Sequence, residues 1–212
     1  MDDTRLLQER YLLTLLRQRE RPRVLYLGTA AGDGERAQLR FLQAFLKLGA
    51  DPVTLPFFPY DMKRDYAREV LAADLVYVGG GNTVAMLAVW REFGFDAVLR
   101  RAWDGGTALA GISAGANCWF EQYVTDSVPG GGVRAGLGWL PGTFCPHLDS
   151  EPWRQSMLAA AALPAYGAPD GVLMRFAGGA CAESVSDRPG LAAVRRLASD
   201  AALGALPTRL LA

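Results

Sequence analysis

Residues 107–120 read TALAGISAGANCWF, and this stretch decides the fold that we expect for the chain. Its first six residues have the small, apolar character of a buried strand, and the residues after Ser113 are compatible with a helix. Between them, GISAG at 111–115 matches the G-x-S-x-G pattern of a tight strand-to-helix turn. Such a turn projects its serine hydroxyl at the carboxyl edge of a sheet, beside the backbone N–H groups of a helix N-terminus. The pattern makes Ser113 a candidate nucleophile, although a small-residue turn without chemistry would have the same sequence.

Upstream of this turn, short apolar runs alternate with helical patterns. Continuous apolar runs such as 24–27 are typical of strands that are covered on both faces. The sequence predicts strands at 24–27, 51–58, 75–78 and 107–112, and helices at 3–19, 35–48, 63–72, 83–93, 95–103 and 114–120. This alternation implies right-handed βαβ crossovers. It predicts an α/β fold with a doubly wound, mostly parallel sheet flanked by helices.

Downstream of the turn the pattern is less regular. We expect a glycine-rich loop at 129–142, a strand at 144–148 and a helix at 152–163. Several short strands separated by PDG and GG turns should follow at 165–187, and a last helix at 191–203. No internal repeat or linker interrupts the chain, so the sequence predicts a single domain over residues 1–212.

Composition excludes several classes of function. The 212 residues are 50% hydrophobic, which suits a sizeable buried core, and 22 basic residues balance 22 acidic ones. That balance argues against a nucleic-acid binder, and no apolar stretch approaches the roughly 18–20 residues of a membrane span. The charged N-terminus lacks the apolar segment of a signal peptide, so we expect a cytoplasmic protein. Three cysteines without a C-x-x-C spacing favour neither a disulfide framework nor a thiolate metal site.

A second motif, GGGNT at 79–83, follows the predicted strand at 75–78. Glycines let the backbone approach a ligand closely and point N–H groups at it. The spacing fits neither a dinucleotide fingerprint nor a Walker motif. We interpret Gly80 or Gly81 as a donor to an oxyanion, together with the Ala114 N–H. The alternative is a tight turn with a helix cap at Asn82 or Thr83.

The chain contains one histidine, His147, in TFCPHLDS at 143–150. A serine at its ordinary pKa is a poor nucleophile and needs an adjacent base. If an imidazole activates Ser113, His147 must supply it. A lone histidine can also be an ordinary surface or core residue, but a turn after a strand is a typical place for a catalytic one.

A carboxylate would orient the imidazole through its other ring nitrogen. Asp126 gives the chain order Ser–Asp–His that is common among hydrolases with this serine turn, and we favour it. Asp126 can instead cap a turn in VTDSVP. The alternatives for the third position are Glu121, Asp149 and the hydrogen-bonding Ser127.

Four motifs in this order, GGGNT, GISAGAN, a loop containing TDS, and CPHLDS, resemble the peptidase E and cyanophycinase family over residues 24–187. The resemblance implies a flavodoxin-like fold, similar to that of class I glutamine amidotransferases but with serine at the elbow. It implies a cytoplasmic serine peptidase without a metal or organic cofactor. Carried over by motif, Ser113 is the nucleophile, His147 is the general base, and Gly80 and Ala114 are the oxyanion donors. Gly81 and Asn82 would line the substrate pocket.

The resemblance also implies a substrate, namely short peptides and especially dipeptides with N-terminal aspartate. An aspartyl side chain requires a cation, preferably arginine. Arg154 is the nearest candidate, ahead of Arg134 and Arg175, and could equally be a solvated helix residue. Two alternatives stay open: a cyanophycinase-like hydrolase of β-aspartyl dipeptides, and a non-catalytic binding or stress module. We expect no nucleic-acid or membrane partner, and a monomer or homodimer.

Overall fold

The computed structural model describes residues 5–17, 20–197, 200 and 202–212. The chain divides into two compact units, Met1–Ala116 and Asn117–Ala212. Each unit contains its own hydrogen-bonded sheet structure.

The first unit is built on a four-stranded sheet in which every pairing is parallel. Its strands lie in the order β2-β1-β3-β4. They are β1 (Arg23–Leu27), β2 (Asp51–Thr54), β3 (Leu75–Val78) and β4 (Ala108–Gly111). The chain proceeds from β1 to one side for β2 and to the other side for β3, which makes β1 and β3 the switch point of a doubly wound sheet.

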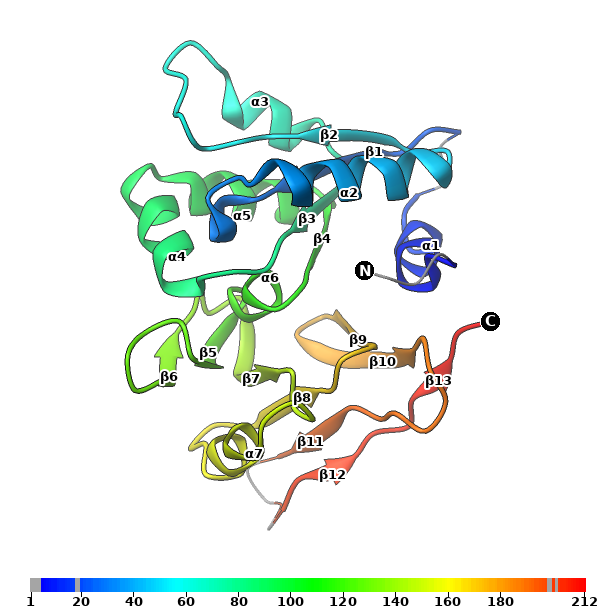
Figure 1. The fold of residues 1–212 in the computed structure, drawn as a ribbon, viewed down its shortest axis with the longest axis vertical. Helices are drawn as coiled ribbons and strands as arrows, with labels where there is room; N and C mark the ends of the chain where they lie inside the picture. Colours follow the sequence, from blue (N-terminus) through cyan, green and yellow to red (C-terminus); the bar gives the residue numbers. More distant parts are fainter. Residues whose placement is uncertain (1–4, 18–19, 198–199, 201) are drawn as a thin grey trace. The chain divides into compact units, whose positions relative to one another are not determined.

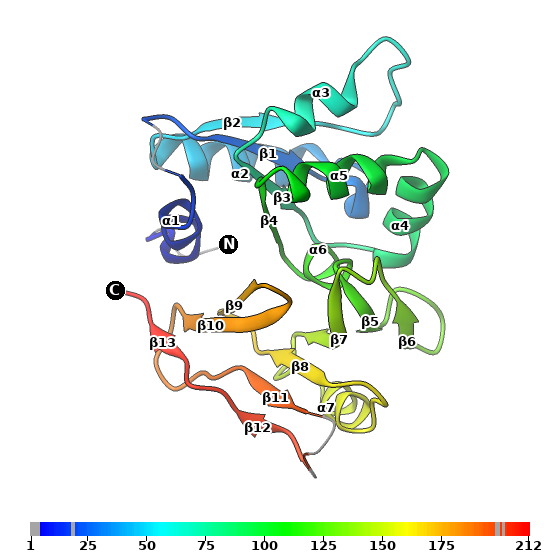
Figure 2. The same cartoon turned by 180° about the vertical axis from the view of Figure 1, so that it is seen from behind.

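Helices cover both faces of this sheet. Helix α2 lies in front of it in Figure 1, and α3 and α5 lie in front of it from the opposite side in Figure 2. The helical elements are α1 (Leu7–Thr14), the 3₁₀ turn η1 (Thr29–Ala31), α2 (Glu35–Lys47), α3 (Tyr66–Leu71), α4 (Thr83–Glu92), α5 (Phe95–Asp104) and α6 (Ala114–Asn117). The predicted α/β fold with a parallel sheet between helices is therefore confirmed.

Aromatic packing fastens α2 to the sheet. Phe41 and Phe45 project from one stripe of α2 and are 0% and 1% exposed. The Phe41 ring centroid lies 4.9 Å from that of Tyr26 on β1 and 5.8 Å from that of Tyr77 on β3. Burial of one such large side chain contributes roughly 1.5–3 kcal/mol. These contacts fix the β1–α2 crossover, which positions the loop at the carboxyl end of β1.

The second unit contains a six-stranded sheet in the order β12-β11-β8-β7-β5-β6 and a three-stranded sheet in the order β13-β10-β9. Strand β7 is parallel to both of its neighbours, β5 and β8. The elements are β5 (Phe120–Thr125), β6 (Gly132–Ala135), β7 (Leu140–Pro146), α7 (Pro152–Ala159), β8 (Ala165–Ala168), β9 (Val172–Ala177), β10 (Ala180–Ser186), β11 (Val194–Arg196), β12 (Gly204–Ala205) and β13 (Arg209–Leu210).

Three expectations for the second half were wrong. The predicted helix at 114–120 ends at Asn117, and Phe120 already begins β5, where it stacks on Phe144 of β7. The predicted loop at 129–142 contains β6 and the start of β7. The predicted helix at 191–203 contains β11 instead, although residues 198, 199 and 201 lie outside the described residues. In each case, pairing with another strand overrides the local preference of the sequence.

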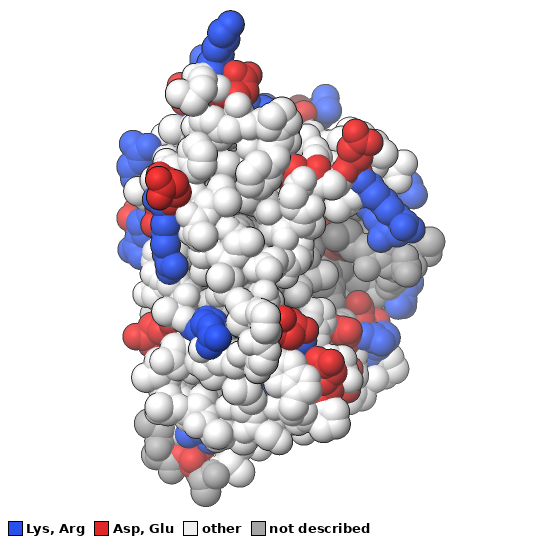
Figure 3. Space-filling model, turned by 60° about the vertical axis from the view of Figure 1, so that its left-hand side comes forward, with Lys and Arg blue, Asp and Glu red and all other residues white. Residues whose placement is uncertain are grey.

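The predicted N-terminal helix at 3–19 is shorter where it is described, and α1 spans Leu7–Thr14. Residues 3, 4, 18 and 19 of that prediction lie outside the described residues. No helix in the described part of the chain is long and apolar enough to cross a membrane. On the face shown in Figure 3, basic and acidic side chains are interspersed.

Candidate functional site

Ser113 lies on the turn between β4 and α6 and has a left-handed backbone, with φ of 55°. Two close backbone approaches enforce this turn. A Cβ at Gly111 would lie 2.1 Å from the Gly115 carbonyl oxygen, and a Cβ at Gly115 would lie 2.2 Å from the Val78 carbonyl oxygen. Real Cβ atoms do not approach backbone oxygens so closely, so both positions require glycine. The G-x-S-x-G spacing is thus explained by close packing of Gly111 within the turn and of Gly115 against the end of β3.

Gly80 lies beside Ser113 at the end of the neighbouring strand. A Cβ at Gly80 would lie 3.2 Å from the Ser113 Cβ and 3.8 Å from its Oγ. Within the described residues, the N–H groups of Gly80 and Ala114 donate to no backbone or side-chain acceptor. Two unused amides next to a serine hydroxyl have the chemistry of an oxyanion hole.

Gly81 and Asn82, predicted to line a substrate pocket, have structural roles here. Gly81 has φ of 140°, and a Cβ there would lie 2.2 Å from the Ala30 carbonyl oxygen. The Asn82 N–H donates to that same oxygen at 2.8 Å. The Asn82 side chain caps α4, because its Oδ1 accepts from the Ala85 N–H at 2.9 Å. These contacts fasten the glycine turn to the loop after β1 and thereby hold Gly80 in place.

His147 directly follows β7 and also has a left-handed backbone, with φ of 55°. Its Nδ1 lies 2.5 Å from Oδ1 of Asp170, and its side chain is 33% exposed. Because an ionised carboxylate only accepts hydrogen bonds, Nδ1 carries the hydrogen in this pair. The other nitrogen, Nε2, then has a lone pair that can accept a proton.

The carboxylate beside His147 was missed from the sequence. Asp170 follows β8, and its turn contains the PDG sequence at 169–171. Strands β7 and β8 are parallel neighbours with Pro146 opposite Ala168, so their carboxyl ends bring His147 and Asp170 together. The sequence shows the PDG turn, but it does not show that this turn lies beside His147.

Asp126, the favoured partner of His147, contacts a different side chain. Its Oδ2 accepts from Nη2 of Arg154 at 2.7 Å. The carboxylate that contacts His147 is therefore that of Asp170, and the expected contact with Asp126 is not formed. The remaining alternatives are also engaged elsewhere: Ser127 with Thr125, Glu121 with the Gly142 N–H, and Asp149 with the Asp170 N–H.

Arg154, which was expected to bind an acidic substrate side chain, is 5% exposed. Two carboxylates bind its guanidinium group. Besides Asp126, its Nε donates to Glu151 at 2.9 Å, and its guanidinium lies over the Trp153 ring. It is therefore a buried member of an ion-pair network rather than an open cation. The weaker candidates are more exposed: Arg134 donates to the neighbouring Val133 carbonyl, and Arg175 lies 3.7 Å from Glu183.

The two buried thiols, Cys118 and Cys145, do not compete with Ser113 as nucleophiles. Cys118 and Cys145 are buried and take part in no disulfide among the described residues. Burial raises the pKa of the Cys145 thiol to about 12 and raises the pKa of Cys118 well above its ordinary value. Both groups therefore remain neutral thiols at physiological pH. Among the described residues, no group of three or more His, Cys, Asp or Glu side chains has the arrangement of a metal site.

Each unit has chemically distinctive groups of its own. The first unit presents a strained serine beside two unused amides, and the second presents an imidazole oriented by a carboxylate. A nucleophile, oxyanion donors and an oriented base are the groups that serine hydrolases use.

Comparisons with known proteins point to the same chemistry. The model of peptidase family S51 matches residues 2–183. A relative, the uncharacterized peptidase YgaJ of Bacillus subtilis (strain 168), is 37% identical over 212 residues, which cover 98% of this chain and 91% of that protein.

Two solved structures are similar in fold. A peptidase from an acI-B1 actinobacterium has a TM-score of 0.65 and 18% identity, with 96% of this chain and 86% of that one covered. A candidate peptidase E from Listeria monocytogenes EGD-e has a TM-score of 0.50 and 18% identity, with 70% and 79% covered. At this level of identity, the likeness extends to the fold alone.

Proposed function

Because the chain belongs to peptidase family S51, we propose that it is a serine peptidase of the peptidase E type that hydrolyses short peptides, with Ser113, His147 and Asp170 as its catalytic triad. The observation that carries the assignment is the pairing of the chain's single imidazole with a carboxylate at 2.5 Å. An imidazole held in this tautomer is suited to act as a general base. No other imidazole in the chain can take that role.

In the proposed reaction, the Ser113 Oγ attacks the scissile carbonyl while Nε2 of His147 takes the hydroxyl proton. The Gly80 and Ala114 N–H groups donate to the oxyanion that forms on the carbonyl oxygen. The C–N bond breaks, His147 returns the proton to the leaving amine, and an ester to Ser113 remains. Water then attacks this ester with the same base, releasing the acid and restoring the serine. Asp170 stabilises the imidazolium at each proton transfer.

A fluorophosphonate probe tests the assignment, because it reacts with an activated serine. We expect labelling of the wild-type chain, loss of labelling in Ser113→Ala, and at least a roughly thousandfold slower reaction in His147→Gln. Ser156→Ala, which removes a hydroxyl on the exposed face of α7, is the matched control and should label normally. An unlabelled wild type would favour a non-catalytic binding module instead.

For the substrate, we propose dipeptides with N-terminal aspartate, with Arg154 binding the aspartyl carboxylate in place of Asp126. The Asp126 side chain is 65% exposed, whereas that of Arg154 is 6% exposed. A substrate carboxylate can therefore displace the exposed partner while Glu151 continues to hold the guanidinium.

Steady-state kinetics on Asp-Leu and Ala-Leu test this exchange. Removing the competing carboxylate with Asp126→Asn should lower KM for Asp-Leu roughly twofold to fivefold, as expected for an exposed ion pair. KM for Ala-Leu should stay unchanged. If KM changes equally for both substrates, Arg154 does not bind the aspartyl side chain. Faster release from β-aspartyl dipeptides than from Asp-Leu would favour the cyanophycinase-like alternative.

A further inference from the structure

We propose that Asp149 and Arg188 are positioning residues that hold Asp170 against His147; this inference rests on the proposed function of that pair. Asp170 lies on the turn of residues 169–172, which closes with a 3.1 Å hydrogen bond from the Val172 N–H to the Pro169 carbonyl. Its side chain is 56% exposed, so burial does not fix the direction of its carboxylate. That direction depends on how the backbone of the turn is held.

The Asp170 backbone is held at both of its polar groups. Its N–H donates to Oδ1 of Asp149 at 3.0 Å, and its carbonyl oxygen accepts from the Arg188 guanidinium. Asp149 lies two residues after His147, so the loop that contains the imidazole also holds the residue that orients it. Together the two contacts restrict rotation of the peptide groups on either side of Asp170.

Arg188 is itself fixed by the loop that follows β10. Its Nε lies 3.2 Å from Oδ1 of Asp187, and its N–H donates to Oγ of Ser186 at 3.1 Å. This loop packs directly on Gly171, which has φ of 92°. A Cβ there would lie 2.5 Å from Asp187 Oδ1 and 2.6 Å from an Arg188 guanidinium nitrogen. Only glycine therefore lets Arg188 reach the carbonyl before it.

The contact between Asp170 and His147, which depends on the two backbone hydrogen bonds of Asp170 to Asp149 and Arg188, is short. The 2.5 Å separation between Asp170 and His147 tolerates little displacement. A misplacement of about 1 Å in a catalytic group can reduce a rate about a hundredfold. Loss of either backbone contact should therefore weaken the Nδ1–H hydrogen bond and slow the reaction, without removing any group that touches the substrate.

Proton NMR reads this hydrogen bond directly, because the chain has one histidine and hence one Nδ1–H resonance. We expect a low-field resonance in the wild type that is lost to exchange with water in Asp170→Asn. It should also broaden or disappear in Arg188→Met, which keeps the side-chain length but has no donor. Arg188→Lys should restore part of it. Asp149→Asn, which still offers an acceptor, should retain it, whereas Asp149→Ala should not.

Activity should follow the same order, with kcat falling between about tenfold and a hundredfold in Arg188→Met and KM unchanged. In an Asp170→Asn background, Arg188→Met should add less than about a twofold loss, because it acts through the missing carboxylate. Arg209→Met is the matched control: Arg209 is 58% exposed, against 56% for Arg188, and also pairs with a carboxylate, that of Glu183. It should change neither the resonance nor kcat.

The proposal that Asp149 and Arg188 position Asp170 would be overturned by one result. In that result, the Nδ1–H resonance is unchanged in both Arg188→Met and Asp149→Ala, and both variants unfold thermally as the wild type does. The NMR result needs no catalytic activity. If fluorophosphonate fails to label Ser113 while the resonance depends on Arg188, the proposed function fails and the positioning role stands.

Discussion

At the scale of single residues, the two groups assigned to proton transfer share an unusual backbone. Ser113 and His147 both have φ of 55°. A residue with a Cβ is less stable by about 1–2 kcal/mol in this left-handed region. Such strain persists where surrounding packing imposes it, and it concentrates at functional sites. At Ser113, the packing of Gly111 and Gly115 imposes this strain. The backbone conformation that directs the hydroxyl therefore lowers the stability of the protein.

Two substitutions at Ser113 separate strain from chemistry. Ser113→Ala and Ser113→Gly should both abolish peptide hydrolysis, because neither has a hydroxyl. Ser113→Gly should be more stable than Ser113→Ala by roughly 1 kcal/mol, since glycine adopts positive φ without the Cβ penalty. Urea unfolding of the two variants measures the difference. A glycine variant no more stable than the alanine variant would show that the turn is not strained.

At the scale of elements, the sequence predicted the first sheet well because its signals are local. The apolar runs of β1, β3 and β4 are four or five residues long and end at glycine or polar residues. In the second unit the deciding interactions are distant. Strand β11 contains residues that favour a helix, yet Val194 pairs with Gly167 of β8. Asp170 was missed for the same reason, since only the β7–β8 pairing shows which turn lies beside His147.

The elbow between β4 and α6 predicts a sharp difference between two glycines. Gly115→Ala should destabilise the protein by about 1–3 kcal/mol or more, because its Cβ would lie 2.2 Å from the Val78 carbonyl oxygen. Gly34→Ala is the control. Gly34 has φ of −58°, and its Cβ would meet no atom closer than 3.7 Å, so we expect a change within about 1 kcal/mol. Comparable unfolding midpoints for both variants would contradict the packing of the elbow against β3.

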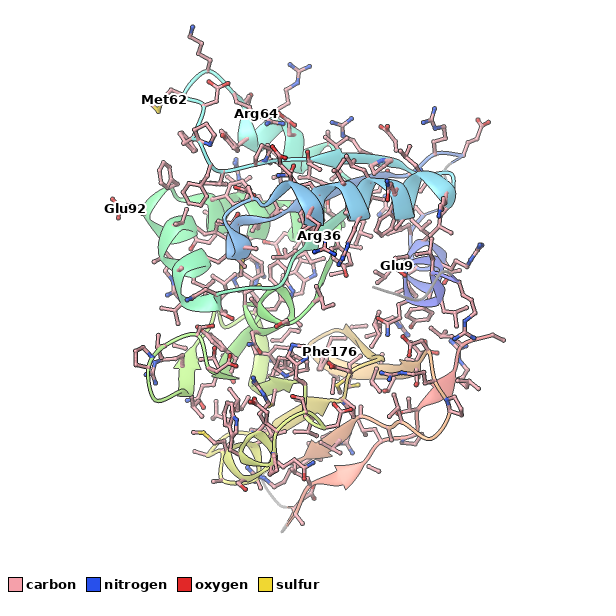
Figure 4. The ribbon with its side chains drawn as sticks, in the orientation of Figure 1. Glu9, Arg36, Met62, Arg64, Glu92 and Phe176 are labelled. Carbon is pink, nitrogen blue, oxygen red and sulfur yellow. The ribbon has the colours of Figure 1, made fainter. Side chains whose placement is uncertain are left out.

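At the scale of the whole molecule, strained residues with polar side chains follow the carboxyl ends of parallel strands. Asp33 lies after β1, Ser113 after β4 and His147 after β7, and all three have positive φ. Asp33 connects two such loops, because its Oδ2 accepts from the Phe57 and Phe58 N–H groups at 2.6 and 2.9 Å. These amides begin the loop between β2 and α3, from whose tip Met62 projects (Figure 4).

This buried carboxylate makes the stability of the molecule depend on pH. Asp33 is 7% exposed, and burial raises its carboxyl pKa in the folded state, although the backbone N–H groups of Phe57, Phe58 and Gly28 oppose that shift. Between the unfolded pKa of about 3.9 and the higher folded value, the folded protein binds more protons than the unfolded chain. The stability from this group is therefore fully present below about pH 4 and is lost as pH rises through the folded pKa.

Asp33→Asn removes this titration and keeps a side-chain oxygen that can accept from the amides, and asparagine tolerates positive φ. The free energy of unfolding of the wild type, minus that of the variant, should fall as pH rises from about 4 to 7. Urea titrations at unit pH intervals measure this difference. A constant difference would mean that the Asp33 carboxyl has the same pKa folded and unfolded. A difference that grew with pH would mean that the N–H groups of the β2–α3 loop outweigh burial, and would make Asp33 a favourable anionic anchor of that loop.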